Sequence, residues 1–182
     1  MWLYIIIVIV VILLWLVFTT YNSFIKLNNR VNEAFSTMDV YLKKRWDLIP
    51  DIVETVKGYA NYEKKTLEEV IKLRNSSYDE MNINDKMNVN NKISQDFIKI
   101  MAIAESYPEL KANENFKDLS NQLTRVEDEI ANSRKYYNGI VRIYNNKVEM
   151  FPSNIIASIF GYKTKKMFEA SLNERESVQI KL

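Results

Sequence analysis

The sequence contains no cysteine and no histidine among its 182 residues. Without cysteine it cannot form a disulfide framework, a thiolate metal site or a nucleophilic thiol. Without histidine it lacks the commonest general base, the commonest metal ligand and the usual pH switch near neutrality. There is also no nucleophile motif, no glycine-rich phosphate loop and no paired-acid spacing. We therefore expect no catalytic residue, no metal site and no cofactor, and we rank an enzyme as the least favoured class.

Glycine and proline are also scarce, with three residues of each. An all-β protein needs far more turn residues, whereas a few long helices need few. The formal net charge of +2 is close to balance and gives no basic patch for nucleic acid. The composition therefore predicts an all-α protein that does not bind nucleic acid.

A long apolar run, MWLYIIIVIVVILLWLVF, opens the chain from Met1 to Phe18 without a charged side chain. As a helix it spans about 27 Å, close to the thickness of a bilayer core. A cleaved signal peptide is disfavoured because the run is long, has no basic segment before it and offers no small-residue cleavage site. A buried core helix would need a much larger protein around it. We predict an uncleaved, single-pass transmembrane anchor over residues 1–20.

Basic residues follow this run and do not precede it. Lys26 and Arg30 lie close to it, and Lys43, Lys44 and Arg45 lie further along the chain. By the positive-inside rule this asymmetry favours a cytoplasmic position for everything after the anchor.

Helical periodicity dominates the remainder. Four apolar stripes, the first with coiled-coil-like heptad spacing, predict an antiparallel bundle of about four long helices over residues 21–162, followed by a charged tail over 163–182. The stripes comprise Phe24, Leu27, Val31, Ala34, Met38 and Tyr41; Val53, Val56, Ala60, Leu67 and Val70; Ile93, Phe97, Ile100 and Ala104; and Phe116, Leu119, Leu123, Val126, Ile130, Ser133, Tyr137, Ile140 and Tyr144.

Three connections are predicted between these helices. Pro50 is interpreted as a first-turn residue after a corner capped by Asp47, because a proline inside a continuous helix costs about 3 kcal/mol; a kinked continuous rod is the alternative. The polar segment 75–91 is predicted to be a surface loop. Pro108 is expected to end the third helix and start the next.

Two segments carry a family resemblance. Residues 21–75 contain the sequence RWDLIPDIVETVKGYA, in which a basic helix runs into Asp-Leu-Ile-Pro. Residues 134–170 contain spaced Tyr-Asn pairs, Phe-Pro and Gly-aromatic in RKYYNGIVRIYNNKVEMFPSNIIASIFGYKTKK. Together these segments closely resemble the LemA family. The resemblance implies a bacterial single-pass membrane protein with a helical-bundle domain, here in the cytoplasmic (inner) membrane, and supplies no reaction. Tyr62 stands where the family often has histidine.

The acidic cluster of Glu127, Asp128 and Glu129 is interpreted as a solvent-exposed helix face, because a carboxylate-bridged metal site in a bundle also uses histidine. The pairs Tyr137-Asn138 and Tyr144-Asn145 lie seven residues apart and so share one helix face. Packing of both rings in the seam is favoured over a polar strip that binds a partner.

The segment FPSNIIASIFGYKTKK, residues 151–166, is the best candidate for an interaction surface. Pro152 is expected to open a short helix that Gly161 ends. If helix directions alternate, this helix returns to the membrane side, where it would touch lipid. The alternative, slightly favoured by pattern alone, is that it caps the bundle core. The candidate contact residues are Phe151, Ile155, Ile156, Ile159, Phe160, Lys163, Lys165 and Lys166.

The leading hypothesis is a membrane-anchored helical scaffold or interaction protein without catalytic activity. Its expected partners are the lipid bilayer and an unknown protein, and self-association stays open. The runner-up is an envelope-associated sensor module that binds a ligand or peptide.

Overall fold

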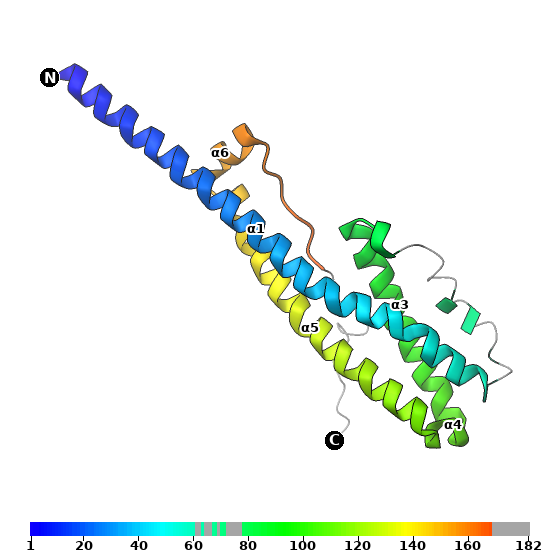
Figure 1. The fold of residues 1–182 in the computed structure, drawn as a ribbon. Helices are drawn as coiled ribbons and strands as arrows, with labels where there is room; N and C mark the ends of the chain where they lie inside the picture. Colours follow the sequence, from blue (N-terminus) through cyan, green and yellow to red (C-terminus); the bar gives the residue numbers. More distant parts are fainter. Residues whose placement is uncertain (61–62, 64–66, 69, 72–77, 169–182) are drawn as a thin grey trace, which may run out of the picture. The chain divides into compact units, whose positions relative to one another are not determined.

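The computed structural model describes residues 1–60, 63, 67–68, 70–71 and 78–168 (Figure 1). Within them the chain is all-α and has no strand. The long helices are α1 (Trp2–Lys57), α3 (Ile83–Ser106) and α5 (Glu114–Glu149). The shorter ones are the 3₁₀ turn η2 (Tyr78–Glu80), α4 (Pro108–Ala112) and α6 (Ser153–Phe160).

The chain divides into two compact units. Unit 1 comprises residues 1–37 and 133–167, and unit 2 comprises residues 38–132 and 168–182. Both α1 and α5 contribute residues to each unit.

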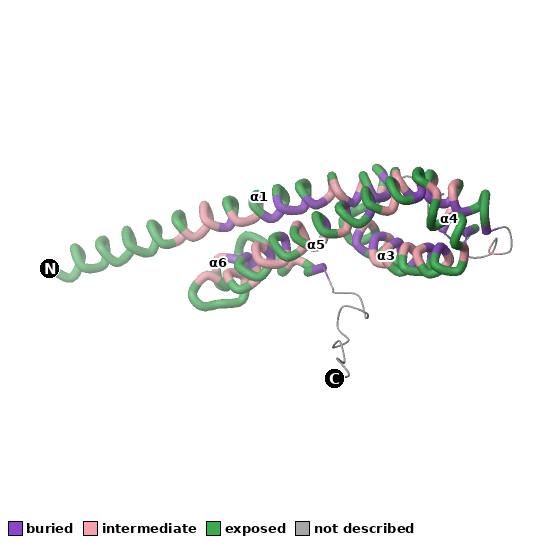
Figure 2. Tube along the Cα trace, turned by 90° about the horizontal axis from the view of Figure 1, so that it is seen from below, coloured by how far each residue is buried: buried purple, intermediate pink, exposed green. Residues whose placement is uncertain are grey.

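In unit 1, α1 and α5 run antiparallel. The ring of Phe24 meets that of Tyr144 edge-on at 6.3 Å, and the ring of Phe35 meets that of Tyr137 at 6.0 Å. Residue numbers rise along one helix as they fall along the other, which is the antiparallel arrangement expected from the two stripes. The turns of α1 before this contact are exposed on all sides, and buried residues begin beyond them (Figure 2).

In unit 2, α1 and α3 run parallel to each other and antiparallel to α5. Asp39 pairs with Lys86, and Arg45 bonds Asn90 and Ser94 one turn and two turns later on α3. Arg45 also reaches Glu127 on α5. The predicted seam residues Val53, Val56, Ile93, Ile100, Leu123, Val126 and Ile130 are buried here.

The predicted corner at Pro50 is wrong. Helix α1 continues through Pro50 to Lys57, and Asp47 is an exposed helical residue paired with Lys43 at 2.6 Å. Three neighbours, Ile49, Ile52 and Val53, are buried. Burying such side chains contributes about 1.5–3 kcal/mol each, which outweighs the cost of about 3 kcal/mol for an internal proline. Tertiary burial therefore keeps this stretch helical.

The turn after α1 lies at Gly58 and Tyr59 instead. The amide of Ala60 donates to the carbonyl oxygen of Val56 at 2.9 Å, which closes the helix end. Of the predicted second helix, residues 67–68 and 70–71 are helical. The long helices among the described residues therefore number three, because the predicted first helix and the start of the second are one helix.

The prediction of a loop over residues 75–91 is also wrong from Ile83 onwards. The side chain of Asn82 caps α3 by accepting a hydrogen bond from the Asp85 amide at 3.0 Å. An Asn followed three residues later by an acid is a capping signal that the sequence does contain. The predicted role of Pro108 is confirmed, because α3 ends at Ser106 and Pro108 opens α4.

We predict that Pro50→Ala stabilises the full chain. It restores a helical amide donor and removes a ring clash, so the free energy of unfolding should rise by about 1–3 kcal/mol. Denaturation in detergent micelles followed by far-UV circular dichroism measures the change. Lys44→Ala, at an exposed position of the same helix, should leave the midpoint unchanged. A lower midpoint for Pro50→Ala would show that the ring makes necessary contacts.

Candidate functional site

The Tyr-Asn pairs of α5 hold an extended segment of the same unit. The rings of Tyr137 and Tyr144 are buried. The Tyr137 hydroxyl donates to the carbonyl oxygen of Lys166 at 3.1 Å. Asn145 makes two bonds to Lys165: its Nδ2 donates to the carbonyl oxygen and its Oδ1 accepts from the amide, both at 2.8 Å. The side-chain amide thus pairs with a backbone residue as a neighbouring strand would.

The bonds from Tyr137 and Asn145 hold the segment that follows α6. Pro152 precedes the first turn of α6, and the Ser153 hydroxyl donates to the carbonyl oxygens of Lys147 at 2.6 Å and Met150 at 2.9 Å. At the other end Gly161 adopts the left-handed conformation with φ 74°, which reverses the chain. The predicted short helix is confirmed.

Aromatic side chains join α6 to α1 in unit 1. The ring of Phe160 lies 4.7 Å from that of Tyr21, and the ring of Tyr162 stacks on Phe24 at 4.7 Å and 15°. Lys147 hydrogen-bonds Ser23, and burial lowers the pKa of its ammonium group. Burial also lowers the pKa of Lys165, whose ammonium lies 5.5 Å from the ring centre of Tyr144. Both lysines are therefore partly withdrawn from water.

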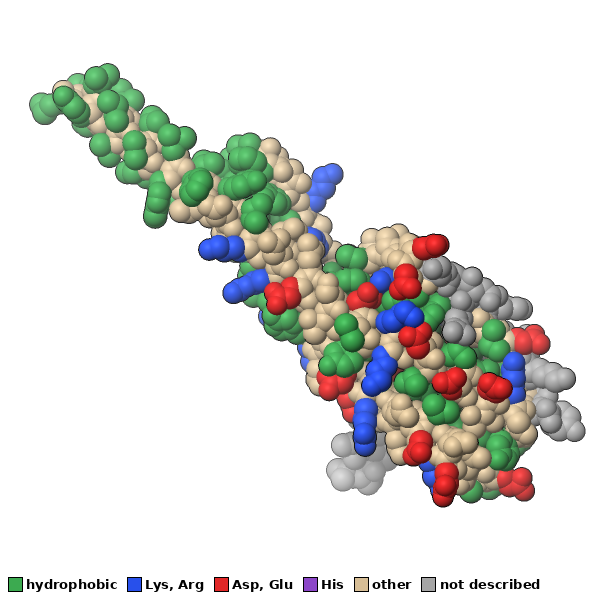
Figure 3. Space-filling view, viewed as in Figure 1, with side chains coloured by type: hydrophobic (Ala, Val, Ile, Leu, Met, Phe, Trp, Pro, Cys, Tyr) green, Lys and Arg blue, Asp and Glu red, His purple; other side chains and the backbone are tan. Residues whose placement is uncertain are grey.

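The candidate contact residues differ in exposure. Ala157 of α6 is buried and Ile156 is half-buried, so one side of the helix packs against the rest of unit 1. The other side is open to solvent. Ile156 and Lys165 are half-buried, whereas the exposed candidates are Phe151, Ile155, Ile159, Phe160, Lys163 and Lys166. Figure 3 shows hydrophobic side chains over the start of α1 and again where α6 lies.

Unit 2 contains a buried arginine that sequence reasoning missed. Arg45 is 1% exposed and holds α3 and α5 against α1. Its Nη1 donates to Ser94 Oγ at 2.7 Å and Glu127 Oε1 at 2.6 Å. Its Nη2 donates to the backbone oxygen of Asn90 at 2.9 Å and to Asn90 Oδ1 at 2.6 Å. We had expected Glu127 to face solvent with its acidic neighbours, but it is half-buried by this ion pair.

A second polar cluster continues from Asn90. Its Nδ2 donates to the carbonyl oxygen of Lys86, and Lys86 pairs with Asp39 at 2.7 Å. The Tyr78 hydroxyl donates to the other Asp39 oxygen at 2.7 Å. Burial and the neighbouring Asp39 carboxylate raise the pKa of Tyr78, so its hydroxyl stays a proton donor. The cluster connects η2, α3 and α1.

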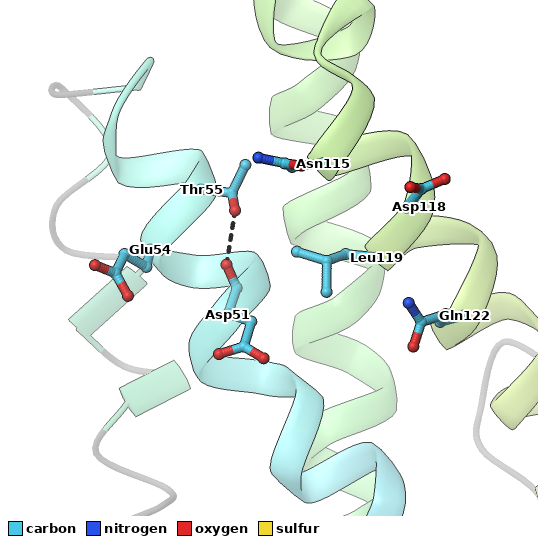
Figure 4. A pocket seen from close by; sticks show the side chains of 7 residues that line it. All are labelled: Asp51, Glu54, Thr55, Asn115, Asp118, Leu119 and Gln122. Carbon is cyan, nitrogen blue, oxygen red and sulfur yellow. Dashed lines mark hydrogen bonds between the residues drawn. The ribbon is translucent and has the colours of Figure 1, made fainter.

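An open groove lies between α1 and α5 in unit 2 (Figure 4). Its volume is about 450 Å³, and it is lined by Leu119 and by six acidic and polar residues: Asp51, Glu54, Thr55, Asn115, Asp118 and Gln122. A hollow of about 370 Å³ beside Pro50 is lined by Ile49, Pro50, Val53, Glu54, Lys57 and Ile71. In the described part of the chain no three acidic, histidine or cysteine side chains are grouped to hold a metal ion. Tyr62 lies outside the described residues.

A sequence profile of the LemA family matches residues 34–182. The chain belongs to the LemA family. Protein LemA of Metamycoplasma hominis is 26% identical over 159 residues, which are 86% of this chain and 72% of that protein. Magnetosome protein MamQ 2 of Paramagnetospirillum magneticum is 32% identical over 71 residues, and magnetosome protein MamQ of Magnetospirillum gryphiswaldense is 31% identical over 70. Each match to a MamQ protein spans only 26% of that protein.

As a LemA family member, the chain begins with a segment long and apolar enough to cross a membrane. The length and composition of α1 support that statement, and none of its most apolar stretch is buried. The helical architecture expected from the family resemblance is present in the described residues.

We predict that Glu127→Gln destabilises unit 2. The substitution keeps an acceptor for Arg45 but removes the charge that balances the buried guanidinium, so the free energy of unfolding should fall by about 1–3 kcal/mol. Chemical denaturation measures the loss. The neighbouring acid Asp128 is exposed, and Asp128→Asn should change the stability by no more than about 0.5 kcal/mol. Equal effects of both variants would contradict a specific role for the Arg45 pair.

We also predict that Asn145→Ala releases the segment after α6. Loss of two net hydrogen bonds, about 0.5–1.5 kcal/mol each, should speed amide exchange of Lys165 about tenfold to a hundredfold. Hydrogen–deuterium exchange of a peptide covering residues 162–167 measures this. Asn146→Ala, at the exposed neighbouring position, is the matched control and should leave exchange unchanged. Unaltered exchange in Asn145→Ala would show that other contacts hold the segment.

Proposed function

We propose that this LemA family protein is a non-enzymatic, single-pass scaffold in the bacterial cytoplasmic membrane. The observation that carries the proposal is the packed interior of unit 2, where Arg45 and its partners occupy the space between three helices. Because these side chains fill the space between the helices and bond to one another, the core supports a role in which the outer surfaces of the helices make the interactions. Its partner would be a protein that binds one of these surfaces.

The charged flank of the anchor supports a cytoplasmic position for the part of the chain that follows the anchor. Lys26 and Arg30 are exposed on α1 just beyond the apolar segment, and basic residues near a membrane span favour the cytoplasmic side. The M. hominis relative, named Protein LemA, covers most of this chain. The MamQ proteins are named as magnetosome proteins, and this chain matches only 26% of the length of each, so they add no role to the proposal.

The runner-up is a sensor module that binds a ligand or peptide, and it rests on the hollow beside Pro50. That hollow combines apolar walls with Glu54 and Lys57. Its volume of about 370 Å³ lies within the range of small-molecule sites.

The groove of unit 2 provides a test of the scaffold. A photo-crosslinking amino acid placed at Gln122, which lines the groove, should capture one cytoplasmic protein in intact cells. The same amino acid at Asn88, which is exposed on α3, is the matched control and should capture less of it. The captured band should weaken when Asp118→Asn and Asp51→Asn remove charge from the groove.

Three results would count against the scaffold. Equal capture from Gln122 and Asn88 would indicate collision without a specific surface. A partner outside the cytoplasm would overturn the orientation. Adducts with a small molecule or short peptide at Val53, beside the hollow, would favour the sensor module.

A further inference from the structure

We propose that α6 lies in the interfacial layer of the membrane that α1 spans, so that unit 1 contacts the bilayer twice. The ligand is the lipid surface itself, with the apolar side of α6 at the boundary between headgroups and acyl chains. The inference rests on the proposed anchoring by α1, and it adds a second contact made by a different part of the chain.

The position of α6 along α1 is the first argument. The ring of Phe160 contacts Tyr21, which is three residues beyond Phe18 at the end of the apolar run. Three helical residues rise about 4.5 Å. The headgroup region on each side of a bilayer is about 5–7 Å thick, since a core of about 30 Å lies within a total of about 40–45 Å. For an anchor near the membrane normal, the contact therefore falls at headgroup depth.

The composition of the segment is the second argument. Residues 150–162 contain no charged side chain. Large apolar residues are exposed there: Met150 61%, Phe151 79%, Ile155 51%, Ile159 70% and Phe160 48%. Exposure of so many apolar side chains on one short segment marks an interaction surface. Its contact residue on α1, Tyr21, directly follows the uncharged span, and Figure 3 shows hydrophobic side chains over both parts of unit 1.

The residues around α6 also suit a membrane interface. Tyr21 and Tyr162 lie within 6.3 Å of each other and have the apolar body and polar tip typical of interfacial aromatics. Tyr162 stacks on Phe24, so Lys163 follows at a level about 9 Å beyond Phe18. That distance is about one Debye length, so the exposed Lys163 and Lys26 can attract anionic headgroups.

The fold holds α6 in this position without help from lipid. Gly161 reverses the chain, and Asn145 fixes the following segment on α5 through two bonds to Lys165. The other side of α6 packs on unit 1 at Ala157. Because the helix is held in place beforehand, lipid contact does not require ordering of the segment.

The absence of native cysteine allows a direct test on the full chain. Spin labels are attached to single cysteines introduced by Val10→Cys in the span, Ile159→Cys on α6 and Val40→Cys on α1. All three positions are exposed. The protein is reconstituted in vesicles of phosphatidylcholine with phosphatidylglycerol, and collisions of each label with oxygen and with a water-soluble nickel complex give its depth.

The expected result places the Ile159 label within about 5–10 Å of the headgroup–acyl boundary, with strong oxygen and weak nickel collisions. The Val40 label, about 33 Å beyond Phe18 along α1, should report water. Ile155→Cys, exposed on the same helix, provides a second position should Ile159→Cys disturb the fold. In phosphatidylcholine alone, and with Lys163→Gln, the Ile159 label should lie shallower.

Three other outcomes overturn the inference, and a fourth removes only the contribution of lipid charge. An Ile159 label in water, with Val10 in lipid, removes the second contact and leaves the anchor intact. Weak collisions with both reagents at Ile159 show that protein covers α6, and spin–spin broadening there would identify a second copy of the chain. A Val10 label in water removes the anchor, and with it both the proposed function and this inference. Depth that does not change with lipid charge excludes the role of Lys163.

Discussion

The buried guanidinium of Arg45 is the interaction on which unit 2 depends. A charged group without water is costly to bury unless nearly all its donors find partners, and Arg45 finds them on α3 and α5. Only one register of the three helices places Ser94, Asn90 and Glu127 within hydrogen-bonding distance of the Arg45 guanidinium. Apolar seams tolerate sliding by a turn far better, because one aliphatic side chain replaces another with little loss. The ion pair and its hydrogen bonds therefore select a single packing from those that the apolar stripes permit.

In unit 1 the corresponding constraint is on the extended segment after α6, which is held in place although no strand in the described part of the chain lies beside it. An isolated extended backbone leaves its amides and carbonyls to water, and nothing then holds its position. Asn145 replaces the missing strand, since its side-chain amide turns an N–H donor and a carbonyl acceptor towards the same residue, as one residue of a paired strand does. Tyr137 adds a third bond at Lys166. The polar strip of α5, for which partner binding was the less favoured interpretation, is thus occupied by the chain itself, and it positions α6 beside Tyr21.

In both units of this LemA family protein, partly buried polar side chains hold neighbouring elements in position. Tyr78 remains a protonated donor to Asp39, and the ammonium of Lys147 is partly buried beside Phe24. Each of these groups bonds to another part of the same unit. Two surfaces that stay exposed among the described residues are the acidic groove of unit 2 and the apolar side of α6, where the two proposals place a protein partner and the lipid surface.

The sequence by itself determined the features that follow from local pattern: the apolar span, the heptad stripes, the start of α4 at Pro108, and α6 between Pro152 and Gly161. Each depends on residues within a few positions of one another, so no distant contact is needed to specify it. Tertiary structure alone decided that α1 passes through Pro50, because burial of Ile49, Ile52 and Val53 against other helices outweighs a local penalty. It also decided the roles of Arg45, Glu127 and Asn145. Their partners lie 20 to 82 residues away, and no local periodicity indicates which distant side chain will meet a buried charge.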